Sequence, residues 1–132
     1  MMVAGFGCRK DVTGEAVAEA LAMAAERCGI DPSQLDALAT PAEKQHEAGF
    51  RDLATLLSLP LIAVEEEEMK QVAERALSLS SRVVALKGVP SVAETVALAA
   101  AGPSARLLAP RVASSSATLS SATCAIAVGD GP

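Results

Sequence analysis

A cysteine and two cations stand together near the start of the chain, at Cys8, Arg9 and Lys10, directly after an apolar segment. Positive charge lowers the pKa of a neighbouring thiol, and the resulting thiolate is a nucleophile if a base lies beside it. His46 is the sole histidine in the sequence and the candidate for that base. More commonly, however, such a cysteine is a small buried thiol, and a histidine among charged residues is a solvated side chain.

Two glycines precede this cysteine, at Gly5 and Gly7 in the segment GFGCRK. Glycine in a strand or at its end lets the backbone turn tightly, or lets a ligand approach it closely. The segment lacks the third glycine of the G-x-G-x-x-G pattern, and Gly88 is not followed by a P-loop pattern. The glycines therefore predict a close approach without a nucleotide-binding signature.

Further cations follow other predicted strands, although the chain is acidic overall. Ligands of open α/β sheets bind at the carboxyl ends of the strands, and Lys44 and Arg111 each follow a predicted strand. Free N–H groups at helix starts near Thr13, Thr40 and Ser91 could bind carboxylate or phosphate. The alternative is that these loops are simply capped and solvated. The sequence thus predicts an anion-binding edge.

The composition excludes several classes of partner. Sixteen acidic against eleven basic residues give a net charge of −5, which disfavours nucleic acid and anionic membranes. Two Phe, with no Trp or Tyr, leave almost nothing for base stacking. Apolar runs are shorter than the ~18 residues that span a bilayer, and three cysteines without metal-ligand spacing favour reduced thiols. We therefore expect a soluble cytoplasmic protein without metal or cofactor.

Short apolar strands alternate with helices along the chain and must position these residues. Strands are predicted at 3–6, 35–40, 59–64, 105–110 and 122–128. Helices are predicted from 13 to 29, from 40 on to about 57, from 65, at about 81–88 and at 91–101, with a single turn after Asp31. The Ser-rich segment 112–122 is expected to be a mobile loop. The alternation predicts one α/β domain of residues 1–132, with a mostly parallel sheet covered on both faces.

Capping signals predict where the helices begin. Thr13 is expected to cap the first long helix, and Thr40 in the motif TPAE to cap the next. Ser91 is expected to cap the clearest helix of the chain, with Glu94 completing a capping box. The run Glu65–Glu68 suits a solvated first turn, because carboxylates oppose the positive end of the helix dipole. A consecutive run cannot converge on one ion, so a metal site there is disfavoured.

Five segments together resemble one family. They are GFGCRKDVT at the start, ATPAEKQHEAGF, GVPSVAE, LLAPR, and CAIA near the end. They are similar to the CobE family, equivalent to the C-terminal domain of CbiG, both of cobalamin (vitamin B12) biosynthesis. The resemblance spans nearly the whole chain and implies a three-layer α/β/α sandwich with a mixed five-stranded sheet. It also implies CbiG as the comparator for chemistry; CbiG opens the lactone of a cobalt-precorrin intermediate and releases a two-carbon fragment as acetaldehyde.

The resemblance implies a precorrin or corrin ligand, whose acetate and propionate carboxylates suit the predicted anion-binding edge. Three functions stay open: a binding protein, an enzyme that hydrolyses or fragments the contracted-ring intermediate through Cys8, Lys44 or His46, and a partner subunit of another pathway enzyme. An Ala-rich helix face suits a homodimer as easily as a core. The expected ligand-binding residues are Gly5, Gly7, Cys8, Arg9, Lys10, Thr40, Lys44, Gly88, Ser91 and Arg111.

Overall fold

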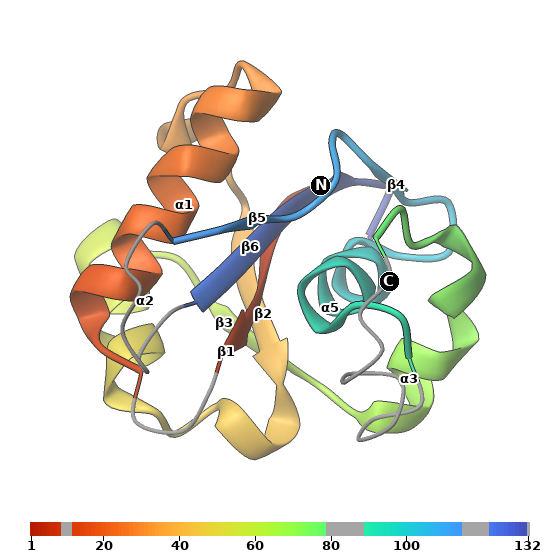
Figure 1. Cartoon of the computed structure of the whole chain (residues 1–132), viewed down its shortest axis with the longest axis horizontal. Coiled ribbons are helices and arrows are strands. Elements are labelled where there is room, and N and C mark those ends of the chain that lie inside the picture. The colour runs from red at the N-terminus through yellow and green to blue at the C-terminus, as the bar shows by residue number, and fades with distance from the viewer. Residues whose placement is uncertain (9–11, 79–88, 115–121, 132) are drawn as a thin grey trace.

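Helices cover both faces of a central sheet in the structure, a computed structural model that describes residues 1–8, 12–78, 89–114 and 122–131 (Figure 1). The strands are β1 (Met2–Cys8), β2 (Ala37–Pro41), β3 (Leu61–Val64), β4 (Arg106–Leu107), β5 (Val112–Ala113) and β6 (Ala122–Val128). The helices are α1 (Gly14–Cys28), α2 (Ala48–Leu57), α3 (Glu66–Gln71) and α5 (Val92–Ala101). Single 3₁₀ turns are η1 (Pro32–Gln34), η2 (Ala42–Lys44) and η3 (Ala73–Arg75).

The sheet is mixed, with the strand order β3-β2-β1-β6-β4 and with β5 beside β6. Strands β1, β2 and β3 are parallel to one another, whereas β6 runs antiparallel to β1, β4 and β5. The predicted α/β/α sandwich is confirmed. The sheet has six strands instead of five, because Val112–Ala113, expected in a loop, pairs with Cys124 and Thr123 of β6.

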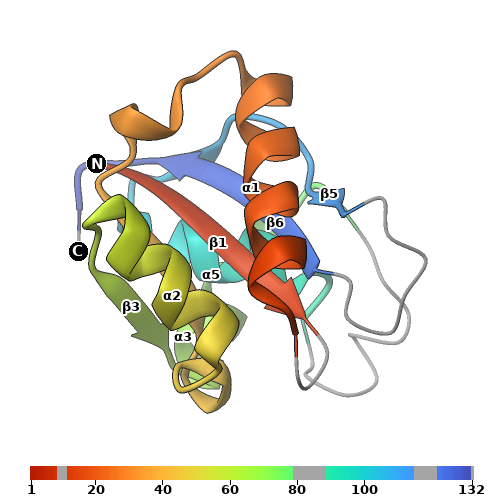
Figure 2. The same cartoon turned by 90° about the vertical axis from the view of Figure 1, so that its left-hand side faces the viewer.

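The two faces of the sheet bury separate apolar clusters. Side chains alternate along a strand, so Ala4 and Phe6 of β1 face α1 and α2, whereas Val3 lies in the cluster beneath α5. Figure 2 shows α1 and α2 in front of the sheet and α5 behind it. The ring centroids of Phe6 and Phe50 lie 5.5 Å apart and join β1 to α2.

Most helix boundaries follow the capping signals. Thr13 Oγ1 accepts a hydrogen bond from the N–H of Ala16 at 3.1 Å, and Gly29 ends α1 in the left-handed conformation. Asp31 caps the predicted single turn at η1. The run of glutamates forms the first turn of α3, where Glu65 takes part in a capping box. These boundaries are set by local side-chain chemistry, which explains why they can be predicted.

The helix start predicted at Thr40 is wrong. Thr40 and Pro41 are the last residues of β2, paired with Ala63 and Val64 of β3. Pairing with β3 keeps these two residues in the sheet, and the 3₁₀ turn η2 lies between them and α2. The short helix predicted at 81–88 lies outside the described residues, as does most of the Ser-rich segment. None of the helices that the structure describes is long and apolar enough to cross a membrane.

Candidate functional site at the carboxyl edge of the sheet

Three helices begin around the carboxyl end of β1. A Cβ atom at Gly49, in the first turn of α2, would lie 3.3 Å from the backbone N of Gly14, where α1 begins. A Cβ atom at Gly7 would lie 3.3 Å from Cβ of Val92, the first residue of α5. The amino ends of α1 and α2 therefore meet on one face of the sheet, and that of α5 lies against the end of β1 on the other face (Figure 1).

A buried carboxylate occupies the first turn of α5. Glu94 is 0% exposed, and its Oε1 accepts hydrogen bonds from the N–H groups of Leu77 and Ser78, both at 2.8 Å. Its Oε2 accepts from Ser78 Oγ at 2.7 Å and from the N–H of Arg111 at 2.9 Å. Of the predicted capping box, the structure describes the half in which Ser91 Oγ accepts from the N–H of Glu94, at 3.4 Å.

The buried carboxylate of Glu94 has two effects at the carboxyl edge of the sheet. It holds the backbone of Arg111 beside the first turn of α5. Arg111 was predicted to follow a strand at 105–110, but β4 ends at Leu107 and Arg111 directly precedes β5. The negative charge of Glu94 also lies at the positive end of the α5 dipole, so the attraction of that helix end for an external anion is largely cancelled. Sequence analysis missed this role because a Ser-x-x-Glu pattern is equally compatible with an ordinary exposed capping box.

Cys8 is a poor nucleophile in this environment. Burial raises the pKa of its thiol to about 11, and of the nearby charges Lys44 lowers it while Glu47 raises it. The prediction of a lowered pKa is therefore wrong, because loss of water around the thiol outweighs the positive charge of Lys44. At pH 7 a group with this pKa is ionised in about one molecule in ten thousand.

The turn between β2 and α2 brings two of the predicted residues to the edge. Lys44 is half-buried and close enough to Cys8 for its charge to act on the thiol, whereas His46 is exposed. Thr40 is 0% exposed at the end of β2, and its Oγ1 has no hydrogen-bond partner among the described residues. Within the part of the chain that the structure describes, the charges of Lys44 and Glu47 act on Cys8, and His46 is not among the groups that do.

The glycines of β1 accommodate a helix. A Cβ atom at Gly5 would lie 2.4 Å from the carbonyl O of Ala93 and 2.6 Å from the N of Ala97. At Gly7 it would lie 2.8 Å from Thr123 Oγ1. The prediction that a ligand approaches these glycines closely is therefore corrected, because α5 and β6 fill the space beside them. Of the other predicted site residues, Arg9, Lys10 and Gly88 lie outside the described part of the chain.

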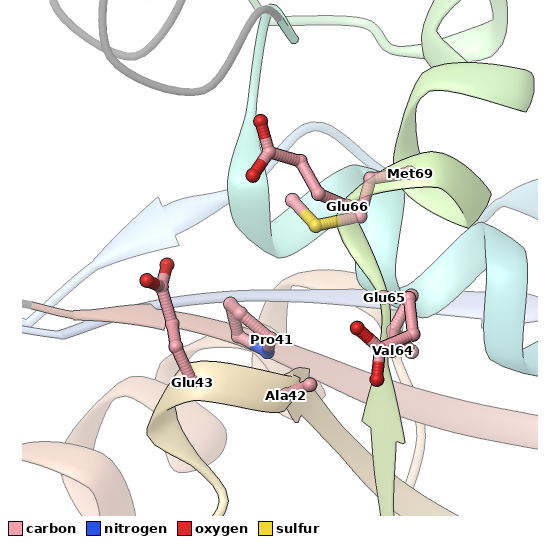
Figure 3. A pocket seen from close by; sticks show the side chains of 7 residues that line it. All are labelled: Pro41, Ala42, Glu43, Val64, Glu65, Glu66 and Met69. Atoms are coloured by element: carbon pink, nitrogen blue, oxygen red, sulfur yellow. The ribbon is translucent and has the colours of Figure 1, made fainter.

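A small pocket of about 90 Å³ lies at the carboxyl ends of β2 and β3 (Figure 3). Strand β2 leads to α2 on one face and β3 leads to α3 on the other, so the segments that follow these two strands separate at the pocket (Figure 1). The pocket has an apolar part and three carboxylates, of which Glu66 also pairs with Lys70 at 3.7 Å. Its lining residues are Pro41, Ala42, Glu43, Val64, Glu65, Glu66 and Met69.

The edge is therefore divided by charge. Cations lie near β1 and β6, at Lys44 and Arg111, whereas carboxylates surround the pocket at β2 and β3. Coulomb repulsion therefore disfavours an anion beside the pocket at β2 and β3. Within the described ranges, His, Cys, Asp and Glu side chains form no group of three that could hold a metal ion.

The chain belongs to the class of α/β/α sandwiches, with α1, α2 and α5 beginning near the carboxyl end of β1 (Figure 1). The family model described as cobalamin synthesis G C-terminus matches residues 2–127, and the chain belongs to this family. The resemblance predicted from the sequence motifs is thereby confirmed. Among curated proteins, none matches the chain significantly.

Solved structures agree with this assignment. CobE, a protein from the cobalamin (vitamin B12) biosynthetic pathway, is 34% identical with a TM-score of 0.84, over 96% of this chain and 89% of that chain. The cobalamin biosynthesis protein chiG from Agrobacterium tumefaciens str. C58 is 38% identical with a TM-score of 0.73, over 98% and 99% of the two chains. A cobalamin biosynthesis protein G homologue from Sulfolobus solfataricus shares the fold, at 23% identity and a TM-score of 0.65, over 96% of this chain and 36% of that chain.

Proposed function

We propose that this member of a cobalamin biosynthesis family binds a carboxylate-bearing corrin or precorrin intermediate at the β1 side of the carboxyl edge. The observation that carries the proposal is that the amino end of α2, where the N-cap side chain makes no capping bond, lies next to the start of α1, and that Lys44 lies beside Cys8 at the end of β1. Backbone N–H groups at such ends bind anions without any change in protonation. Lys44 adds a positive charge that acts on Cys8 at the end of β1, and Arg111 adds another on a backbone held by Glu94 in the first turn of α5.

The chemistry of the ligand fits these groups. Corrin precursors carry several acetate and propionate arms, which an arginine can bind through two parallel hydrogen bonds and a lysine as a point charge. The macrocycle would lie on aliphatic side chains, since Phe6 and Phe50 are the two aromatic residues of the chain and both are fully buried. Recognition through the carboxylate arms therefore carries most of the specificity.

Binding is favoured over catalysis by the state of Cys8. A nucleophilic thiol must ionise, and a pKa of about 11 opposes this at neutral pH. His46 is exposed to solvent, which does not hold the imidazole in the fixed orientation that a base needs. The alternative of an enzyme that opens or fragments the contracted ring would have to use other groups, with Lys44 as the remaining candidate for proton transfer.

The test is titration of the purified protein with corrin-pathway intermediates, followed by absorbance, with the mass of the ligand checked afterwards. Arg111→Ala and Lys44→Ala should each weaken binding about fivefold to tenfold, because each removes one charge-assisted contact. Arg27→Ala is the control, since Arg27 is exposed in the last turn of α1, at the other end of that helix.

A saturable shift with unchanged ligand mass supports the proposal. Loss of a two-carbon or acyl fragment would instead identify an enzyme. Absence of any shift would overturn ligand binding and favour a partner subunit.

A further inference from the structure

Helix α2 begins at the carboxyl edge with an open amino end. The side chain of its N-cap residue, Glu47, does not cap the helix, and the first turn from Ala48 to Arg51 contains no acidic residue. Phe50 and Arg51 donate to the carbonyl of Glu47, and the N–H groups of Ala48 and Gly49 have no hydrogen-bond partner among the described residues. By contrast, the ends of α1, α3 and α5 are capped by their own side chains.

A buried hydroxyl lies on the same side of the sheet. Leu38 of β2 packs in the cluster with Phe50 of α2, and Thr40, two residues further on, faces the same way. Thr40 is 0% exposed and its Oγ1 lacks a partner among the described residues. A buried hydroxyl without a partner is rare in folded proteins. The Thr40 hydroxyl is therefore a candidate to form a hydrogen bond with a group of a bound ligand.

We propose that Thr40 and the first turn of α2 form a subsite for one carboxylate arm of the ligand. Thr40 Oγ1 donates to one carboxylate oxygen, the N–H groups of Ala48 and Gly49 donate to the other, and Lys44 supplies the positive charge. The residues that join Thr40 to α2 are half-buried or exposed from Ala42 onward. The arm reaches the hydroxyl when this turn moves aside. The inference rests on the proposed function only for the identity of the whole ligand.

The local charges favour a carboxylate over a phosphate. Among the described residues, the charge of Glu47 acts on Cys8 at the same edge and opposes that of Lys44. Such a site tolerates a single negative charge better than the double charge of a phosphate. Direct hydrogen bonds from neutral donors then carry the recognition.

The test follows the backbone amides of ¹⁵N-labelled protein during titration with propionate, with inorganic phosphate and chloride at matched ionic strength for comparison. We expect saturable shifts at Ala48 and Gly49 with propionate and weaker ones with phosphate. Thr40→Val should weaken propionate binding at least about fivefold, whereas Thr40→Ser, which keeps the hydroxyl, should retain most of it. Thr55→Val is the control, because Thr55 is exposed on α2.

Thermal unfolding separates a ligand contact from a structural role. Removing an unpartnered buried hydroxyl should raise the melting temperature of Thr40→Val while binding falls. Equal propionate binding by Thr40→Val and the unchanged protein would overturn the subsite, as would an absence of shifts at Ala48 and Gly49.

Corrin intermediates separate the two proposals. Equal binding of corrin intermediates by Thr40→Val and by the unchanged protein would also refute the subsite, and the proposed function would still stand. Their failure to bind at all, with propionate still shifting the α2 amides, would refute the proposed function alone.

Discussion

The buried carboxylate of Glu94 permits a quantitative test of the fold. In Glu94→Gln the amide oxygen can replace Oε1 and still accept from the N–H groups of Leu77 and Ser78. The amide nitrogen then replaces Oε2 and faces two donors, Ser78 Oγ and the N–H of Arg111. The serine hydroxyl can rotate to become an acceptor, but the N–H of Arg111 cannot, so one buried backbone donor loses its partner.

These changes set the expected size of the effect. Leaving a buried donor unsatisfied costs about 1–3 kcal/mol, and each of the three surviving hydrogen bonds weakens by roughly 0.5 kcal/mol when the acceptor loses its charge. Together they predict a decrease of about 3 kcal/mol in the free energy of unfolding. For a domain of this size that corresponds to roughly 10 °C in melting temperature.

Urea unfolding measures this change directly, with Glu67→Gln as the control, since Glu67 is exposed in α3 and should change stability by less than about 0.5 kcal/mol. Hydrogen exchange should also speed up at Leu77, Ser78 and Arg111, because their N–H groups contact the altered side chain. A loss below about 1 kcal/mol with unchanged exchange would refute the reasoning that Glu94 ties these three segments together.

Two further predictions concern packing and ionisation. Gly5→Ala should lower the stability of the folded protein in thermal unfolding by about 3 kcal/mol or more, because its Cβ would overlap the α5 backbone at Ala93. Gly14→Ala is the control and should be near neutral, because a Cβ there has nothing within 4 Å. Equal effects of the two substitutions would contradict the close approach of α5. Alkylation of Cys8 by iodoacetamide, located by peptide mass spectrometry, should rise about tenfold per pH unit and level off only near pH 11. Because the folded state holds this proton more tightly than the unfolded chain, the free energy of unfolding should fall between about pH 8.5 and 11, and Cys8→Ser should lack this part of the decrease. A plateau in reactivity near pH 8.5 would show that the thiol is not desolvated.

Local signals in the sequence predicted much of the fold. Thr13 and Gly29 mark the ends of α1, and Ser91 marks the start of α5, because capping depends on side chains within a few residues of the helix end. The same signals failed at Thr40. There, pairing with β3 extends β2 through the residues that would otherwise start a helix. A neighbouring strand outweighed the local preference.

The candidate site, like the fold, was predicted from the sequence only in part. The sequence correctly predicted that Lys44 follows a strand, since η2 comes directly after β2, whereas Arg111 precedes β5 instead of following a strand at 105–110. It could not predict that Arg111 is held by a carboxylate from another helix, or that Glu43, Glu65 and Glu66 line a pocket together. These contacts join segments distant in the chain, so no local pattern encodes them.

The amino-acid sequence by itself determined the class of fold, the family and the presence of charged groups at the strand ends, since these depend on periodicity, capping and motif. The tertiary structure alone decided the state of each group: burial raised the pKa of Cys8 against its cationic neighbours, helix α5 filled the space above Gly5, and Thr40 was left without a partner among the described residues. Desolvation, steric contact and hydrogen-bond satisfaction are properties of the surroundings in three dimensions, and packing creates those surroundings.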